Sequence, residues 1–286
     1  AKKDFYTYLV AYSSHYEGKL KLPWPCKFFL LSKYAKKIYA RDFLTSDDLT
    51  QQLRKKVSFL GNPFMDKFSL IDENLKNSQF NIGLFPGSRY PESLDNFSLI
   101  LDLLEKISNI KYFENIEFNF AFVDSLSAEK IKQILHKRGW LHLDENPNNE
   151  YLTFGFQSIK VNFIWNLFEE ILFKSKFVIS MAGTASEQAI GLAKPVVQIE
   201  GKGPQFTKSF AEAQRRLLGK YVFCASNFKD REDQINQTIN LILKLMYFIK
   251  IDKQFLVSCY KNAKLRLGGF NSCIRIVDDL TCFMEK

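Results

Sequence analysis

The sequence predicts an α/β fold with a doubly wound parallel sheet at its centre. Short, fully apolar runs alternate with longer amphipathic runs, which is the pattern of strands that helices cover on both faces. Turns that contain Gly or Pro separate the two kinds of run. In such sheets a ligand binds beyond the carboxyl ends of the strands, so we expect the site in the turns that follow them.

The first half of the chain begins this alternation. The expected strands are short and apolar, at 37–41, 57–60, 81–85 and 116–123. The expected helices carry start signals, such as early carboxylates or a proline in the first turn, at 46–55, 91–108 and 127–138.

The second half continues it. We expect strands at 151–154, 160–164, 177–181, from Val196 onward, and at 221–224. We expect helices at 165–175, directly after Thr184, and at 206–218, 230–249 and 252–266, with one more after the Gly268-Gly269 break.

The most informative segment runs from Phe177 to Glu200. It predicts a buried strand, a tight turn at Ala182-Gly183-Thr184, a short helix and a second buried strand. A helix that starts directly after a strand presents free backbone N–H groups and the positive end of its dipole, which suits a phosphate group. We therefore expect a nucleotide at Gly183 and Thr184, although close packing of strand and helix also favours glycine there.

A second turn, Gly87-Ser88-Arg89, also follows an expected strand. Gly87 permits close approach of the backbone, and the Arg89 guanidinium can grip two phosphate oxygens at once. The alternative is a plain turn in which Arg89 forms a surface salt bridge with the helix that starts near Glu92. Because both turns lie at carboxyl ends of strands, we expect them to build one site.

The formal net charge of +9 narrows the class of partner. Basic proteins favour phosphates, nucleic acid or anionic membranes. We expect no nucleic-acid partner, because no run of Lys and Arg interleaved with aromatic residues marks one strand or helix. The 5 cysteines show no metal-ligand spacing with the 3 histidines. We therefore expect no bound metal, and we also expect no cofactor. We expect the cysteines to be free thiols in a reducing cytoplasm.

The ends of the chain suggest a cytoplasmic protein cut from something longer. No apolar run approaches the roughly 20 residues of a transmembrane helix, and the start lacks both Met and the apolar core of a signal peptide. We expect a domain boundary near Gly61-Asn62-Pro63, because the residues before it are too few for an independent α/β domain of the same kind.

Four motifs stand in a recognisable order: Phe59-Leu-Gly-Asn-Pro-Phe-Met-Asp66, Leu84-Phe-Pro-Gly-Ser-Arg89, Ser180 to Glu187, and Gly203-Pro-Gln-Phe-Thr207. Together they resemble the bacterial lipid-A-disaccharide synthases, in particular the proteins of cyanobacteria related to them. The resemblance implies a GT-B fold, with two Rossmann-like domains facing across a cleft. It also implies a division into a remnant of the acceptor domain (1–62), a domain that holds the UDP-sugar (63–250), and helices that pack back toward the N-terminal domain (251–286).

The resemblance also implies roles for single residues. Gly87, Ser88, Arg89, Gly183 and Thr184 would hold the diphosphate, Gln205, Phe206 and Thr207 the donor sugar, and the turn after Ile164 the base. Related enzymes place a ribose-binding Glu seven residues before the proline that ends this helix. Glu187 lies eight residues before Pro195 and Gln188 seven, so either is a candidate. The alternatives are a first-turn Glu187 that stabilises the helix dipole and a Phe206 that packs as a hydrophobic staple.

The implied reaction belongs to lipid A biosynthesis. A glucosamine-type sugar would pass from UDP to a lipid-linked sugar acceptor, with inversion and without metal. The family's acidic catalytic residues precede the start of this chain, so no catalytic residue is assigned. We expect the lone His15 on the surface; the alternative is that it acts as a base. The alternatives are a non-catalytic nucleotide-sugar-binding module or inactive fragment, and a UDP-sugar 2-epimerase, which needs acidic and histidine residues around the cleft.

The segment 19–37 mixes Lys with Trp, Phe and Leu. One interpretation is a surface that rests on the anionic inner membrane, at about 1 kcal/mol per basic residue. This would suit an enzyme with acylated substrates. The other is an ordinary core strand with solvated lysines.

Overall fold

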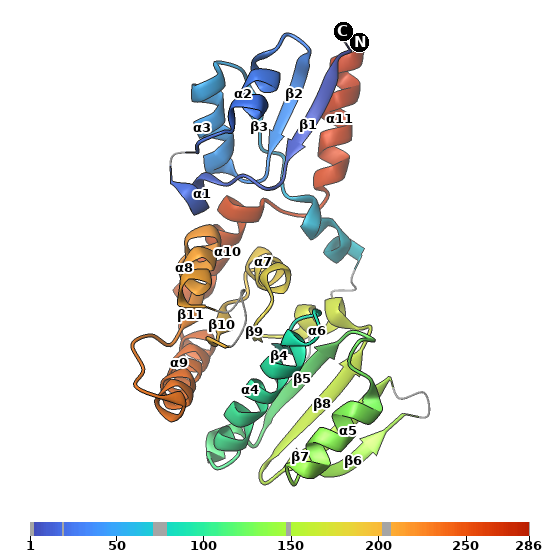
Figure 1. The fold of residues 1–286 in the computed structure, drawn as a ribbon, viewed down its shortest axis with the longest axis vertical. Coiled ribbons are helices and arrows are strands. Elements are labelled where there is room, and N and C mark those ends of the chain that lie inside the picture. The colour runs from blue at the N-terminus through green and yellow to red at the C-terminus, as the bar shows by residue number, and fades with distance from the viewer. Residues whose placement is uncertain (1–2, 19, 71–78, 147–149, 202–206, 286) are drawn as a thin grey trace.

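The computed structural model describes residues 3–18, 20–70, 79–146, 150–201 and 207–285, which form two α/β units stacked end to end (Figure 1). The N-terminal unit has a three-stranded sheet in the order β1-β2-β3. The C-terminal unit has an eight-stranded sheet in the order β11-β10-β9-β4-β5-β8-β7-β6. This arrangement confirms the predicted α/β fold class.

The N-terminal unit is parallel throughout. Its strands are β1 (Phe5–Leu9), β2 (Ala35–Ala40) and β3 (Val57–Ser58), and its helices are α1 (Ser14–Glu17), α2 (Trp24–Leu31) and α3 (Phe43–Leu53). Asp42 starts α3 by accepting a 2.8 Å hydrogen bond from the Thr45 backbone N–H. The alternative of a core strand within 19–37 is wrong for 24–31, which form the helix α2.

The large sheet is parallel in its middle and antiparallel at one edge. Its strands are β4 (Phe80–Phe85), β5 (Ile116–Phe122), β6 (Leu141–Glu145), β7 (Tyr151–Phe156), β8 (Ile159–Trp165), β9 (Phe177–Ser180), β10 (Val196–Gln198) and β11 (Val222–Cys224). The expectation of an all-parallel sheet fails at β6 and β7. Only a hairpin turn joins β7 to β8, and a parallel pair needs a crossover connection of a dozen or more residues.

Helices cover both faces of this sheet. One apolar core lies under α4 (Glu92–Ile107), α5 (Ala128–Lys137) and α9 (Arg231–Ile251). A second lies under the 3-10 segment η1 (Pro63–Leu70), α6 (Phe168–Lys174), α7 (Gly183–Gly191), α8 (Lys208–Leu218) and α10 (Lys253–Leu267). A short 3-10 turn, η3 (Lys111–Phe113), precedes β5. The phenylalanines fill the first core in stacks such as Phe120 on Phe163, with ring centroids 5.2 Å apart.

The chain crosses between the two units twice, and the crossings touch. The backbone N–H of Asn62 donates to the Leu267 carbonyl at 2.8 Å. Gly268 has a φ of +83°, and a Cβ there would lie 2.6 Å from the Gly61 Cα, so a larger residue does not fit. Beyond this point α11 (Ser272–Met284) runs up the N-terminal unit, where Asp279 accepts hydrogen bonds from Lys37 and Tyr39, both at 2.7 Å.

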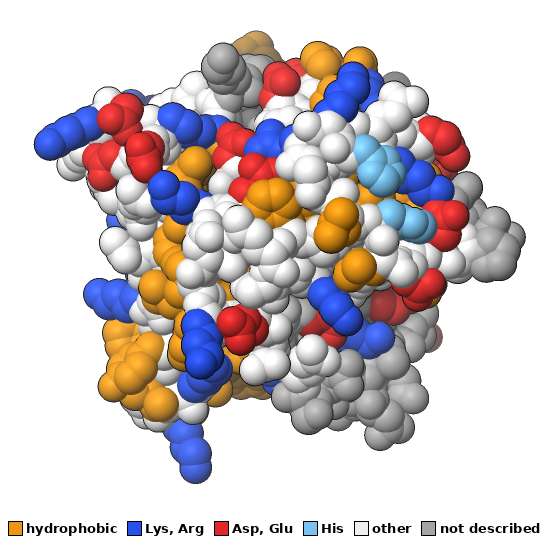
Figure 2. All heavy atoms as spheres, turned by 90° about the horizontal axis from the view of Figure 1, so that it is seen from below, with side chains coloured by type: hydrophobic (Ala, Val, Ile, Leu, Met, Phe, Trp, Pro, Cys, Tyr) orange, Lys and Arg blue, Asp and Glu red, His pale blue; other side chains and the backbone are white. Residues whose placement is uncertain are grey.

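The far end of the large unit carries mixed charge. Figure 2 views the molecule from below and shows acidic and basic side chains interspersed over this face, without a field of one sign. In the part of the chain that the structure describes, no helix combines the length and apolar character needed to cross a bilayer.

Candidate functional site

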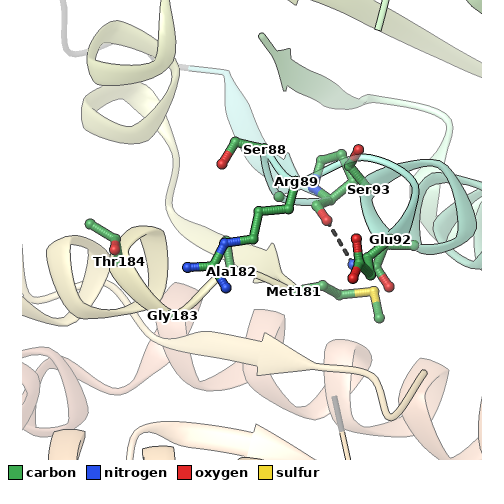
Figure 3. A pocket seen from close by; sticks show the side chains of 11 residues that line it. Ser88, Arg89, Glu92, Ser93, Met181, Ala182, Gly183 and Thr184 are labelled. Atoms are coloured by element: carbon green, nitrogen blue, oxygen red, sulfur yellow. Dashed lines mark hydrogen bonds between the residues drawn. The ribbon is translucent and has the colours of Figure 1, made fainter. Parts of the chain in front are cut away.

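Two loops that follow neighbouring strands converge on one small cavity. The turn after β4 and the turn between β9 and α7 line a space of about 150 Å³ (Figure 3). A 2.8 Å hydrogen bond from the Met181 N–H to the Phe85 carbonyl holds the two loops together. Gly87 has a φ of +102° next to the Met181 carbonyl, a backbone conformation that favours glycine. Gly87, Ser88, Arg89, Gly183 and Thr184 therefore surround one space.

The Arg89 side chain extends from the first loop to the start of α7 (Figure 3). Its guanidinium forms no ion pair or hydrogen bond with any residue that the structure describes, so the expected alternative of a salt bridge to Glu92 is not present. The first N–H that bonds within α7 is that of Ser186, to the Ala182 carbonyl. The preceding N–H groups and the positive end of the helix dipole therefore face the same cavity as the guanidinium.

Two polar side chains of α4 add to this cavity. Ser93 Oγ and Asn96 Oδ1 are buried, line the cavity and have no hydrogen-bond partner among the described residues. The Asn96 amide donates to the Pro86 carbonyl at 2.8 Å, which fixes its orientation. A buried polar atom without a partner is unfavourable, so these two atoms favour a polar occupant. The only sign of these two residues in the sequence is that both are polar and lie on the buried face of an amphipathic helix.

A larger, mainly apolar cavity of about 470 Å³ adjoins the small one and shares Gly87, Ser88, Ala182 and Thr184 with it. Its large apolar lining residues come from η1, the end of β5 and the start of α6: Phe64, Phe122, Val123 and Phe168. Ile164 lines neither cavity, because its side chain packs into the core beside α6. A site for a flat apolar group therefore lies directly beside a site for an anion.

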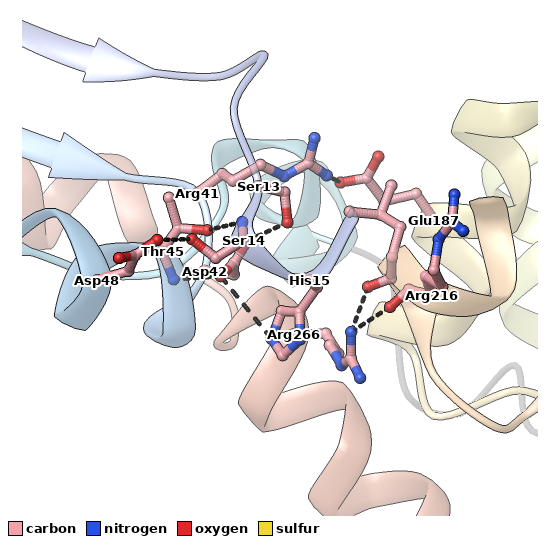
Figure 4. Close-up of polar contacts among 11 residues, drawn as sticks. Ser13, Ser14, His15, Arg41, Asp42, Thr45, Asp48, Glu187, Arg216 and Arg266 are labelled. Carbon is pink, nitrogen blue, oxygen red and sulfur yellow. Dashed lines mark hydrogen bonds and ion pairs between the residues drawn. The ribbon is translucent and has the colours of Figure 1, made fainter. Parts of the chain in front are cut away.

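Glu187 and Gln188 point to different places. Glu187 lies in the second turn of α7, not in the first as expected, because the helix already begins at Gly183. Its buried carboxylate pairs with Arg41 of the N-terminal unit and accepts a 3.1 Å hydrogen bond from the Asn62 amide (Figure 4). Gln188 lines the apolar cavity and donates to the Phe64 carbonyl at 3.3 Å. Of the two candidates, only Gln188 faces the cavities.

The remaining expected residues lie elsewhere. Gln205 and Phe206 fall outside the described residues. Thr207 caps α8 by accepting a hydrogen bond from the Phe210 N–H, and it lines neither cavity. The expectation that His15 lies on the surface is wrong: its side chain is 11% exposed and sits 3.8 Å from Asp42 Oδ1. In 3–18, 20–70, 79–146, 150–201 and 207–285, no group of His, Cys, Asp and Glu is arranged to hold a metal ion.

The fold defines a class of protein. Two Rossmann-like units face each other through the carboxyl ends of their strands, since Arg41 follows β2 and pairs with a helix that follows β9. This is the GT-B fold.

Comparisons with known proteins agree with this class. No protein-family model matches the chain, and no curated protein matches it in sequence. Among solved structures, a Listeria monocytogenes protein described as a UDP-N-acetylglucosamine 2-epimerase matches with a TM-score of 0.54 and 15% identity, over 88% of this chain and 60% of that one. UDP-GlcNAc 2-epimerase from Neisseria meningitidis bound to UDP-GlcNAc matches with a TM-score of 0.52 and 17% identity, over 94% and 71%.

A third structure, the S. aureus MnaA–UDP co-structure, has a TM-score of 0.52 and 14% identity, over 88% of this chain and 62% of that one. The chain thus spans about three-fifths of the length of the Listeria and S. aureus proteins. At these identities the likeness establishes the fold.

Proposed function

We propose that this chain binds a UDP-sugar in the two adjoining cavities and transfers the sugar to an acceptor. The observation that carries the proposal is the convergence of Arg89 and the start of α7 on one small cavity. A guanidinium without a partner among the described residues and a helix N-terminus together favour a diphosphate, and both stabilise the charge that grows as UDP leaves. The adjoining apolar cavity has the size and lining for a nucleoside.

Within this proposal the roles follow from position. Gly87, Ser88, Gly183 and Thr184 contact the diphosphate through backbone N–H groups and hydroxyls, and Arg89 grips its oxygens. Gln188 bonds the ribose, since its amide reaches the apolar cavity. Val123 and Phe168 contact the base in place of the expected turn after Ile164. The donor-sugar role of Gln205, Phe206 and Thr207 rests on the family resemblance.

Two alternative reactions are compatible with this donor site. The four sequence motifs support transfer of a glucosamine-type sugar to a lipid-linked sugar, as in the lipid-A-disaccharide synthases. The structural neighbours support 2-epimerisation, since two of them are described as UDP-N-acetylglucosamine 2-epimerases. The partly buried His15 and the buried Asp42, beside the junction of the units, are residues of the kind that epimerisation requires.

Calorimetric titration tests the donor site. Arg89→Ala should weaken UDP binding by about tenfold or more, because a charge-assisted contact is lost, while binding of uridine should not change. Arg89→Lys keeps the charge but loses the planar guanidinium. Its affinity for UDP should lie between those of the unmodified chain and Arg89→Ala. Unchanged UDP affinity in Arg89→Ala would overturn the proposal.

Product analysis then separates the reactions. UDP-N-acetylglucosamine is incubated with the chain, with and without a lipid-linked glucosamine acceptor. UDP release that depends on the acceptor supports transfer, and a 2-epimer formed without acceptor supports epimerisation. Binding without either product supports a nucleotide-sugar-binding module.

The acceptor side of the proposal includes an anionic membrane surface. α2 exposes four large apolar side chains: Trp24, Phe28, Phe29 and Leu31. The rings of Trp24 and Phe28 stack at 6.0 Å, and the exposed lysines Lys21, Lys27 and Lys33 flank them. Exposed aromatic rings with a basic rim suit the interface of an anionic bilayer, which would bring the N-terminal unit to an acylated acceptor.

A further inference from the structure

A third cavity, of about 580 Å³, lies between α1 of the N-terminal unit and the α8–α10 pair of the C-terminal unit. Within the part of the chain that the structure describes, it shares no lining residue with the two donor cavities. Four of its lining residues are basic: Arg215, Arg216, Lys220 and Arg266. Glu212 is the carboxylate that lines it, so the described lining carries an excess of positive charge.

Among the described residues, the cations in this cavity outnumber the carboxylates that line it. None of the four forms an ion pair with a residue that the structure describes. Arg216 lies over the Tyr16 ring at 5.7 Å, and Lys220 over the Tyr221 ring at 5.5 Å. These ring contacts leave the N–H donors available, and mutual repulsion of the cations makes the cavity favourable for an anion.

Arg266 is held in place for such a role (Figure 4). One terminal nitrogen of its guanidinium donates to the carbonyls of Arg216 and Leu217, at 2.7 and 2.8 Å. Its Nε is buried and has no hydrogen-bond partner in the described part of the chain. Burial lowers the pKa of this guanidinium, and the negative charge of Asp42 offsets only part of that effect. An oxyanion would supply the missing acceptor.

His15 lines this open cavity from the N-terminal unit. Its Nε2 is buried without a hydrogen bond among the described residues and lies 3.8 Å from Asp42 Oδ1. Asp42 is already engaged, because it accepts 2.8 Å hydrogen bonds from Ser13 Oγ and the Thr45 N–H. Burial, and then the positive charge of Arg266, lower the pKa of His15, so an anion beside it would favour the protonated ring.

We propose that this cavity is a second anion site, which binds an oxyanion of the phosphate class between the guanidinium groups of α8 and α10 and the imidazole of α1. The occupant contacts both units, so its binding links them. The site does not depend on the donor site, and its ligand is either free phosphate or a phosphate group attached to a sugar.

Proton NMR of the imidazole resonances tests this site in the whole chain. The chain has 3 histidines, so His15→Gln assigns the resonance of His15 by its loss. Titration with inorganic pyrophosphate should shift the His15 resonance and leave those of His136 and His142 in place. It should also raise the apparent pKa of His15.

Substitutions identify the groups that hold the anion. Arg215 and Arg216 are exposed, so the double variant Arg215→Gln/Arg216→Gln should fold and should weaken pyrophosphate binding by about tenfold or more. The control is Lys111→Gln/Lys137→Gln, which removes the same charge from exposed positions outside the cavity and should leave the affinity unchanged.

Two further titrations identify the source of the phosphate. Inorganic phosphate and glucosamine 1-phosphate are compared by the same His15 shift. If glucosamine 1-phosphate binds more tightly than inorganic phosphate, the ligand is a phosphorylated sugar. If the two affinities are equal, the ligand is free phosphate. If no phosphate compound moves the His15 resonance, or if both double variants weaken binding equally, the proposal is overturned. Failure of UDP to bind elsewhere would leave this result unaffected.

Discussion

Arg41 and Glu187 form an ion pair that joins the two units of the molecule. Arg41 follows β2, Glu187 lies in α7, and their side chains are 12% and 10% exposed. Asn62, in the segment that crosses between the units, donates a second hydrogen bond to the same carboxylate at 3.1 Å. The pair therefore fixes the helix that starts at the candidate diphosphate site against the opposite unit.

The first prediction concerns this pair. Arg41→Ala should lower the free energy of unfolding by about 3 kcal/mol, because it leaves a buried carboxylate without its cation. Glu187→Gln in the same chain should restore part of the loss by removing the unpaired charge. Urea denaturation followed by fluorescence measures both changes.

The matched control is the exposed pair of Lys106 and Glu232, whose side chains are 48% and 71% exposed. Lys106→Ala should change the free energy of unfolding by less than about 1 kcal/mol, because water screens an exposed pair. Equal effects of Arg41→Ala and Lys106→Ala would contradict a structural role for the buried pair.

The second prediction tests which of Gln188 and Glu187 binds the ribose. Gln188→Ala should weaken UDP binding by about tenfold but leave the affinity for 2′,3′-dideoxyuridine diphosphate unchanged, because that ligand lacks both ribose hydroxyls. Glu187→Gln should affect the two ligands equally, since its carboxylate faces Arg41. The reverse pattern in calorimetry would assign the ribose to Glu187.

Local features of this fold can be predicted from the sequence, and contacts between distant residues cannot. The strand before Gly87 and the strand before Gly183 were predicted nearly to the residue, because their apolar runs and turn signals are local. The partner of Glu187 was not predictable in this way, because Arg41 is 146 residues away and no local pattern encodes the pair. α2 was missed because its exposed aromatic residues break the usual relation between apolar side chains and burial.

The third prediction concerns Asp66, which caps a distant helix. Its carboxylate accepts hydrogen bonds from the Ser272 N–H and hydroxyl and from the Cys273 N–H, at 2.7 to 2.8 Å, so η1 caps the start of α11. Asp66→Ala should destabilise the protein by about 1–2 kcal/mol, because a helix start loses its acceptor and its favourable charge. Hydrogen exchange should speed up at the amides of Ser272 and Cys273.

This cap also has a pH dependence. Burial favours the neutral carboxyl, but the bonds from Cys273 and Ser272 outweigh it and lower the pKa of Asp66 below its usual 3.8. A depressed pKa contributes stability above pH 3.8 that is lost as the pH falls through the folded-state value. Asp66→Asn should therefore reduce the loss of stability on acidification. The free energy of unfolding is measured by urea titration at several pH values. If Asp66→Asn loses as much stability at acidic pH as the unmodified chain, the role of Asp66 in this pH dependence is contradicted.

The last prediction tests the exposed face of α2 in a vesicle flotation assay. Anionic vesicles should carry the chain upward, and vesicles of zwitterionic lipid should carry much less, because the flanking lysines contribute only at a negative surface. Trp24→Ser/Phe28→Ser should weaken binding to the anionic vesicles by about tenfold or more, because two interfacial rings are lost. Tyr247→Ser/Tyr260→Ser is the matched control, since these rings are 58% and 57% exposed but lie on α9 and α10. If the unmodified chain stays below the anionic vesicles, or if both double variants lose binding equally, α2 is not a membrane contact.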